Sequence, residues 1–397
     1  MRIPRGSLTF SLFAALASSR APAQARTPQL HAAVDLRIEK PLSEASRSPM
    51  MTVGPSGEMI VASGQVSGTV RGFDSTGRAF AWSLPIGNNR DSEIRWVWRM
   101  GWVDKTLWVA DPGFAQLALI DRGGKVTKSL EYPSWVRPSW ADRRKFPVFG
   151  GVEPLALYAD GSWLVRPSKE RSLVATPEYD NTSGYLMRIK ENGSVERVVA
   201  RVPRNDARVD FRFRNAPEAS APSYAPLTLW DVSSDGSHVV VVTTALGGAD
   251  SATYRVTALS GLGDTLYSRR IPFVPVPMSK QSIDSVRSRF SRSIGRRSAE
   301  EVGEAAVKQL PWAYPPVERL IAGCDQTTWI ELRSTTAEHT WLVLDATGTP
   351  TGTVVFPKAF VLRAAKRDRG WGFDRDSDRV SSLVRYKVVA GAAPSKR

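Results

Sequence analysis

The sequence predicts an all-β protein, a six-bladed β-propeller of four-stranded antiparallel blades. Short apolar segments alternate with turns that contain Gly, Asp and Asn along most of the chain, a pattern typical of β-meanders. Two turn-and-strand patterns recur five times in the same order, and repeated meanders indicate a propeller. Apart from the long connections, the length leaves about 45 residues for each of six blades, within the usual range of roughly 40 to 50.

Residues 1–25 have the pattern of a secretory signal peptide. Arg2 and Arg5 precede an apolar segment at 8–18, and small residues end at Ala25. The apolar segment is too short to span a bilayer. We therefore expect an exported protein, periplasmic or secreted, with no transmembrane segment. The propeller is expected over residues 26–390 and a flexible tail over 391–397.

The first recurring pattern is a tight turn followed by an apolar strand, and it starts at residues 55, 104, 159, 234 and 324. Trp108, Trp163 and Trp329 take equivalent places in three copies. The second pattern is an apolar strand that runs into a turn ending at Gly77, Gly124, Gly193, Gly263 or Gly348. Each unit is therefore expected to contain four strands, with tight turns after the first and the third.

A sixth unit provides only three strands, at 359–365, 369–375 and 381–389. The apolar-polar alternation at 32–40, before the first unit, predicts a strand that lacks partners of its own. We expect this N-terminal strand to close the last blade, because a closed ring removes exposed sheet edges.

Four long segments interrupt the repeats, at 132–150, 166–184, 203–225 and 278–311. Strand parity places all four on the same face of the disc, opposite the tight turns. Because binding sites are often built from loops on a rigid scaffold, we expect this face to be the functional one. The alternative is that the segments only cap the core.

The segment 279–310 is expected to form a helical insertion between blades 4 and 5. Ile283, Val286, Phe290 and Ile294 recur at helical spacing. Ser298 with Glu301 predicts a capping box at the start of a second helix. This helical pair is interpreted as a lid, a brace or a partner surface.

The candidate ligand-binding residues lie on the same predicted face. Aromatic and basic residues alternate in the segment that begins at 132, and rings and guanidinium groups suit sugars, peptides or anionic ligands. Asp111 ends a second strand on this face and is either a ligand-binding group or a turn residue before Pro112. The aromatic side chains could instead pack beneath the loop. The candidates in the segment are Trp135, Arg137, Trp140, Arg143 and Arg144.

Motifs for catalysis are missing from the sequence. The three histidines lie far apart in the chain, and no G-x-S-x-G, H-E-x-x-H, C-x-x-C or phosphate-binding Gly loop occurs. The lone Cys324 excludes an internal disulfide. The net charge of +15 is compatible with an anionic partner, but without a long Lys/Arg run we expect no nucleic-acid binding. We expect a monomeric binding protein rather than an enzyme.

The stretch "LWVADPGFAQLALIDRGGKV", residues 107–126, resembles one blade of the six-bladed propellers of the NHL and TolB-like superfamily, especially its exported bacterial members. The resemblance implies the propeller fold and leaves the function open, because this architecture has many functions. The fold is also similar to that of lactonases of the gluconolactonase and paraoxonase kind, which hold calcium in the central funnel. By that resemblance, Glu93, Glu153 and Glu318 are candidate Ca²⁺ ligands, and the alternative function is a calcium-dependent lactonase or esterase.

Overall fold

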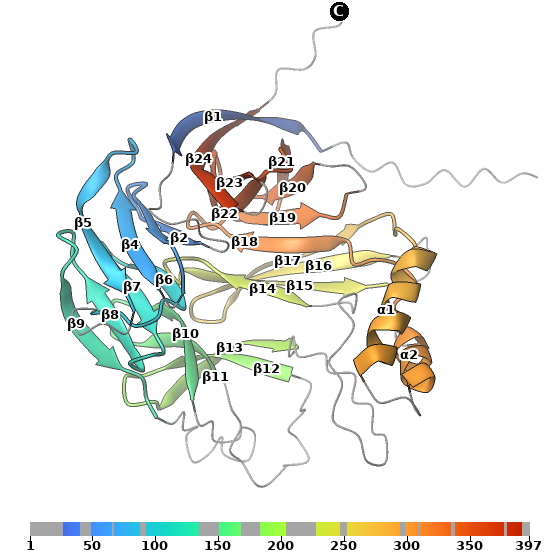
Figure 1. The fold of residues 1–397 in the computed structure, drawn as a ribbon, viewed down its shortest axis with the longest axis horizontal. Coiled ribbons are helices and arrows are strands. Elements are labelled where there is room, and N and C mark those ends of the chain that lie inside the picture. Colours follow the sequence, from blue (N-terminus) through green and yellow to red (C-terminus); the bar gives the residue numbers. More distant parts are fainter. Residues whose placement is uncertain are drawn as a thin grey trace, which may run out of the picture.

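The structure is a computed structural model that describes residues 27–39, 49–65, 67–87, 93–134, 151–167, 183–203, 228–246, 252–293, 299–308, 310–334, 338–376 and 379–390. Antiparallel sheets are arranged around a common centre (Figure 1), which is the arrangement of a β-propeller. In the four-stranded sheets the first strand lies nearest this centre and later strands lie farther out.

Four sheets contain four strands each, paired in chain order. The first has β2 (Met50–Val53), β3 (Met59–Ala62), β4 (Gly68–Phe73) and β5 (Ala79–Ile86). The second has β6 (Arg99–Val103), β7 (Thr106–Asp111), β8 (Gln116–Ile120) and β9 (Val126–Glu131). The third has β10 (Val152–Leu157), β11 (Trp163–Pro167), β12 (Ser183–Ile189) and β13 (Val195–Pro203). The fourth has β14 (Leu229–Val232), β15 (His238–Ala245), β16 (Thr253–Ser260) and β17 (Thr265–Pro272).

The fifth sheet has eight strands and joins the two ends of the described chain. It contains β18 (Val317–Ala322), β19 (Thr328–Leu332), β20 (His339–Leu344), β21 (Pro350–Phe356), β22 (Phe360–Lys366), β23 (Arg369–Asp376), β24 (Arg379–Ala390) and the N-terminal β1 (Gln29–Glu39). Strand β1 is antiparallel to β24 along most of its length, and its first residues also pair in parallel with β21. The N-terminal strand therefore covers the edge of β24.

Glycine recurs at the same position of the tight turns because the backbone there has a positive φ. Eight of the turn glycines have φ between 71° and 89°, a region that side chains with a Cβ rarely adopt. At Asp74, the carboxylate accepts hydrogen bonds from the backbone N–H groups of Thr76 and Arg78 at 2.8 and 3.0 Å. An Asp-x-x-Gly sequence thus satisfies its own turn, as expected for a hairpin with a left-handed residue. The glycines are Gly57, Gly77, Gly124, Gly161, Gly193, Gly236, Gly263 and Gly348.

The hydrophobic core lies between neighbouring sheets. Trp108 of β7 and Trp163 of β11 belong to one buried cluster, and Trp329 of β19 belongs to another. All three indoles are fully buried. The recurring tryptophans therefore fill the space between sheets, and at the usual value of roughly 25 cal/mol for each Å² of buried apolar surface, side chains of this size dominate the packing energy.

Two helices follow β17 and precede β18. They are α1 (Lys280–Ser293) and α2 (Ala299–Lys308), and they pack mainly against each other. Figure 1 shows the pair at the rim of the disc. In the part of the chain that is described, no helix is long and apolar enough to cross a membrane.

Candidate functional site

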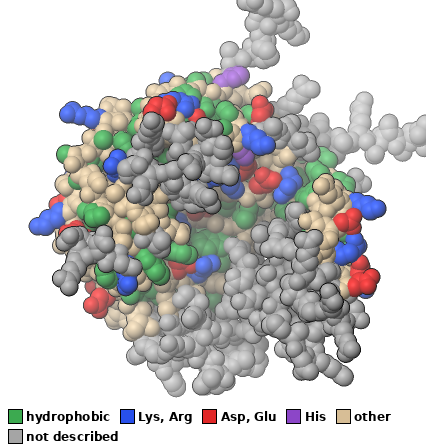
Figure 2. All heavy atoms as spheres, viewed as in Figure 1, with side chains coloured by type: hydrophobic (Ala, Val, Ile, Leu, Met, Phe, Trp, Pro, Cys, Tyr) green, Lys and Arg blue, Asp and Glu red, His purple; other side chains and the backbone are tan. Residues whose placement is uncertain are grey.

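A cavity of about 180 Å³ lies where the innermost strands meet. We call it the axial cavity. Its walls come from β2, β6, β14, β18 and β22, and Figure 1 places these strands around the centre of the disc. Figure 2 shows hydrophobic side chains with basic ones nearby in this central region. The lining residues are Met50, Met51, Thr52, Val53, Arg99, Met100, Asp231, Val232, Ser234, Ile321, Ala322, Cys324, Arg363, Ala364 and Ala365.

Backbone contacts hold the walls of the axial cavity close together. The N–H of Trp102 donates to the carbonyl of Ser234 at 2.8 Å, which joins the end of β6 to the turn after β14. A Cβ on Gly101 would lie 2.4 Å from the same carbonyl oxygen, so this approach requires glycine. The Ser234 hydroxyl also lies 3.4 Å from the carbonyl of Val53 in β2. Strands from three different sheets therefore meet at this end of the axis.

An ion pair crosses the axial cavity between β6 and β14. The Arg99 guanidinium lies 3.6 Å from the Asp231 carboxylate and donates to the carbonyl of Val232 at 2.9 Å. Asp231 also accepts a hydrogen bond from the N–H of Ala322 in β18 at 2.9 Å. Burial raises the pKa of Asp231, and the charge of Arg99 opposes this rise. This pair partly neutralises one cation of the cavity.

Arg363 is the other cation in the wall of the axial cavity. It occupies a register shift between Leu362 and Ala364 in the pairing of β22 with β23, and such a bulge redirects a side chain out of the normal alternation. Its side chain is exposed. Partial burial, together with the positive charges of Arg375 and Arg319, lowers the pKa of Arg363. Across the described ranges, no carboxylate or hydrogen-bond acceptor pairs with this guanidinium.

A cluster of aromatic and charged side chains spans three sheets on the side where the chain passes from one sheet to the next. We call this side the connection face, and Trp98, Glu153, Arg166 and Trp230 the aromatic cluster. The Trp98 indole N–H donates to Glu153 Oε1 at 3.0 Å. Arg166 Nε donates to Glu153 Oε2 at 2.7 Å, and its guanidinium lies 5.7 Å from the centre of the Trp230 ring.

The aromatic surface of this face continues beyond the cluster. Trp98 is 46% exposed, and Trp96 and Phe114 are 42% and 49% exposed. Arg95 stacks over the Phe114 ring at 5.9 Å. Exposed rings beside fixed guanidinium and carboxylate groups form a surface that suits ring-shaped or polar ligands.

A second charged group on the connection face involves Glu331, which is buried in β19. Arg319 of β18 donates to both of its carboxylate oxygens, and the ring Nδ1 of His339 lies 2.5 Å from Glu331 Oε1. The Arg319 guanidinium also lies over the ring of Trp341 at 5.3 Å. Because Glu331 already has two partners, its role here is to hold Arg319 in place.

Asp111, a candidate ligand-binding residue, is fully buried at the end of β7. Its two oxygens accept hydrogen bonds from the backbone N–H groups of Arg95 at 2.7 Å, Trp96 at 3.0 Å, Gly113 at 2.9 Å and Phe114 at 3.3 Å. In the structure this carboxylate fixes the two connections that carry the exposed aromatic residues. It supports the connection face and offers no exposed oxygen to a ligand.

The three glutamates predicted as Ca²⁺ ligands do not lie together around a common site. Glu93 is exposed ahead of β6, Glu153 pairs with Arg166, and Glu318 pairs with Arg333 at 3.1 Å. Within the described ranges, no three His, Cys, Asp or Glu side chains form a group able to hold a metal ion. Trp135, Arg137, Trp140, Arg143 and Arg144 lie outside the described residues.

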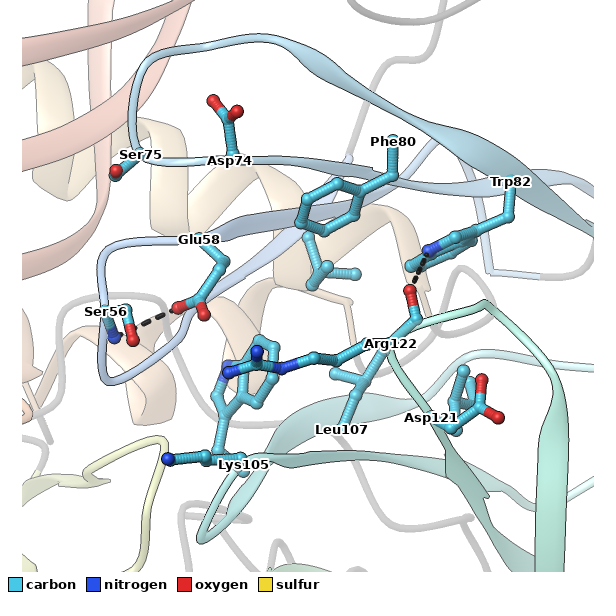
Figure 3. Close-up of a pocket in the computed structure, with 13 residues that line it drawn as sticks. Ser56, Glu58, Asp74, Ser75, Phe80, Trp82, Lys105, Leu107, Asp121 and Arg122 are labelled. Atoms are coloured by element: carbon cyan, nitrogen blue, oxygen red, sulfur yellow. Dashed lines mark hydrogen bonds between the residues drawn. The ribbon is translucent and has the colours of Figure 1, made fainter.

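A second cavity, of about 240 Å³, opens between the β2–β5 and β6–β9 sheets on the side of the tight turns. Figure 3 shows Phe80 and Trp82 along its upper wall, with Arg122 and Lys105 below them. The Trp82 indole donates to the carbonyl of Arg122 at 3.0 Å, which links the two sheets. The Glu58 carboxylate accepts from the backbone N–H of Ser56 at 3.0 Å. The charges in this cavity are mixed, so its lining favours no particular ligand.

Sequence reasoning did not find Trp98, Arg166, Arg99 or Arg363. For Trp98 the sequence did contain a pattern that indicates exposure. Trp96 and Trp98 alternate with the buried Val97, as expected for an extended segment with one open side. Arg363 stands among apolar residues in β22, a strand that ends at Lys366. That it lines a cavity depends on the bulge, which the residue pattern does not reveal.

The fold and these sites define a propeller-like protein with an arginine-bearing axial cavity. No model of a known protein family and no curated protein matches the sequence. The chain resembles solved structures over most of its length, among them two bacterial proteins. A member of the DUF4221 family from Bacteroides vulgatus is 12% identical, covers 92% of this chain and 100% of its own, and has a TM-score of 0.49. The calcium-binding protein regucalcin from Agrobacterium tumefaciens is 12% identical, with coverages of 92% and 97% and a TM-score of 0.36.

Proposed function

We propose that the chain is an exported, monomeric binding protein with six blades, of the NHL and TolB-like kind, which binds its ligand or protein partner at the connection face. The eight-stranded sheet is then two blades, β18–β21 and β22–β24 with β1, joined by the short parallel contact. On this assignment α1 and α2 form an insertion between blades 4 and 5. The pairing of β1 with β24 supports six blades because it gives the last three strands a fourth partner.

The aromatic cluster is the observation that carries the binding proposal. Trp98 presents nearly half of its surface to solvent while Glu153 fixes its indole N–H. Glu153 is in turn held by Arg166. A ring that is already oriented loses little freedom when a ligand stacks on it, which favours binding.

The proposal is tested by a thermal-shift screen of the protein against cell-wall fragments and acidic polysaccharides. Each compound that raises the melting temperature is then titrated against Trp98→Ala and, as a matched control, Leu262→Ala, since Leu262 is 48% exposed in the tight turn between β16 and β17, on the opposite side. We expect Trp98→Ala to weaken binding about tenfold, or about 1.4 kcal/mol, and Leu262→Ala to leave it unchanged. Equal affinities in the two variants, or a screen without any stabilising compound, would count against the connection face.

The calcium-dependent lactonase or esterase is the alternative. It requires Glu153 or Glu318 to give up an arginine partner for the metal, because both carboxylates are already paired. For the binding protein we expect Ca²⁺ and EDTA to leave the melting temperature unchanged. Stabilisation by Ca²⁺ that disappears in Glu153→Gln would favour the hydrolase.

A further inference from the structure

We propose that the axial cavity binds the anionic group of a small molecule, a carboxylate or a phosphate, through the guanidinium of Arg363. This site is separate from the aromatic cluster, and its chemistry is set by the charges on the cavity wall. Arg363 is an exposed arginine of the cavity for which the described part of the chain provides neither an ion pair nor a hydrogen bond.

The surroundings of Arg363 favour an anion over other ligands. The positive charges of Arg319 and Arg375 act against the charge of Arg363. Arg319 is paired with Glu331, whereas Arg363 has no counter-charge among the described residues. Arg375 lies beside the start of β22, since its N–H donates to the carbonyl of Ala359 at 2.9 Å. A bound anion would relieve this repulsion.

Neither Asp231 of the cavity lining nor Glu331, the partner of Arg319, provides that counter-charge. Asp231 is held by Arg99 and by the N–H of Ala322, and Glu331 is held by Arg319 and His339. The described lining therefore has two arginines and one aspartate, with a surplus of one positive charge at Arg363.

The size and the apolar walls limit the ligand further. A cavity of about 180 Å³ admits a small ion or a short acid. Met50, Ile321 and Ala364 provide apolar surface next to the cation, which suits the carbon skeleton of a small carboxylic or phosphorylated compound. The forked guanidinium matches either oxyanion with two parallel hydrogen bonds.

The test is isothermal titration calorimetry of the full chain with sodium phosphate and, separately, with sodium succinate, with ionic strength matched by sodium chloride. We expect saturable binding of one anion per chain, and the tighter of the two probes distinguishes phosphate from carboxylate. Arg363→Gln should weaken this binding at least tenfold. The matched control Arg255→Gln, which removes an exposed arginine of β16 outside the cavity, should retain affinity within twofold.

The inference is overturned if the wild type binds neither probe, or if Arg363→Gln binds as tightly as the control. If Arg363→Gln fails to fold, the site is tested in the wild type instead. Its arginines are labelled with phenylglyoxal, and the labelled peptides are identified by mass spectrometry. Protection of the peptide containing Arg363 by phosphate or succinate supports the site, and equal labelling with and without both anions contradicts it. Failure of the connection-face proposal appears separately, in the Trp98→Ala comparison.

Discussion

At the scale of single residues, buried polar groups define the shape of the connection face. The Asp111 carboxylate has four backbone N–H partners and no exposure to solvent. If the carboxylate is lost, these donors lose their acceptor in a partly buried place, and an unsatisfied buried donor costs about 1–3 kcal/mol. The residue therefore matters for folding, and through folding for the position of Trp96 and Phe114.

We predict that Asp111→Ala lowers the free energy of unfolding by roughly 3 kcal/mol, because the four donors lose a charged acceptor together. The measurement is urea unfolding followed by tryptophan fluorescence. Asp121→Ala is the control, since that carboxylate is exposed and accepts a bond from the N–H of Lys125 in a turn. It should cost less than about 1 kcal/mol. A loss below that value at Asp111 would contradict the structural role.

The burial of His238 is expected to make the stability of the fold depend on pH. It is fully buried in β15, and burial lowers its pKa below the usual value of 6.5. When the pH falls below 6.5, the unfolded chain takes up a proton that the folded protein does not, so the stability decreases. Above 6.5 the imidazole is neutral in both states and contributes no pH dependence.

We therefore expect a lower melting temperature at pH 5.5 than at pH 7.5, and part of that decrease should disappear in His238→Gln. His31→Gln is the control because His31 is exposed on β1, and it should keep the full decrease. A His238→Gln variant with an unchanged pH dependence would show that other groups cause the acid sensitivity. Differential scanning calorimetry at several pH values provides the data.

At the scale of elements, the helical pair is attached to the propeller through two adjacent chain segments, 276–278 and 312–314, which we call the neck. Met278 N–H donates to the carbonyl of Trp312 at 3.1 Å, and Tyr314 N–H donates to that of Val276 at 2.9 Å. Within the pair, Arg287 of α1 pairs with Glu304 of α2 at 2.5 Å. The two helices stabilise each other, and the sheets do not depend on them for their pairing.

We predict that replacing residues 280–309 by a short Gly-Ser linker preserves the fold. The neck keeps both ends of the linker close, and a shorter loop costs little closure entropy, about 0.6 kcal/mol for each doubling of loop length. Circular dichroism and a melting curve test this. An unfolded or aggregated deletion variant would mean that the helices are part of the folding unit.

At the scale of the whole molecule, β1 joins the two ends of the described chain. Its antiparallel register with β24 runs from Leu30 opposite Ala390 to Glu39 opposite Ser382. Side-chain contacts reinforce it, with Arg385 donating to Asp35 at 2.8 Å and Arg37 to Asp374 at 2.6 Å. Without β1, the open edge of β24 would be available to other chains.

We predict that a chain starting at residue 40 aggregates or unfolds at a much lower temperature than the chain that includes β1. Adding a synthetic peptide of residues 27–39 should restore part of the stability, because the peptide supplies the missing strand. Size-exclusion chromatography and melting curves provide the measurement. A stable monomer without β1 would contradict the closure of the ring by this strand.

The strands, the tight turns and the core tryptophans could be predicted from the sequence because each depends on local rules. The glycines recur where the backbone needs positive φ, as at Gly124 and Gly348. Trp108, Trp163 and Trp329 recur where the sheets pack. These signals lie within a few residues of each other and repeat along the chain. The number of blades and the export of the chain to the periplasm or the medium remain predictions.

The candidate sites were decided by tertiary structure alone. Arg99 and Asp231 are far apart in the sequence and meet only because β6 and β14 converge at the axis. The environment of Arg363 depends on a bulge and on charges from other strands. The sequence by itself determined which segments pair and turn, since those interactions are short in range. Which side chains gather around the centre depends on how the sheets close upon each other, and no local pattern contains that information.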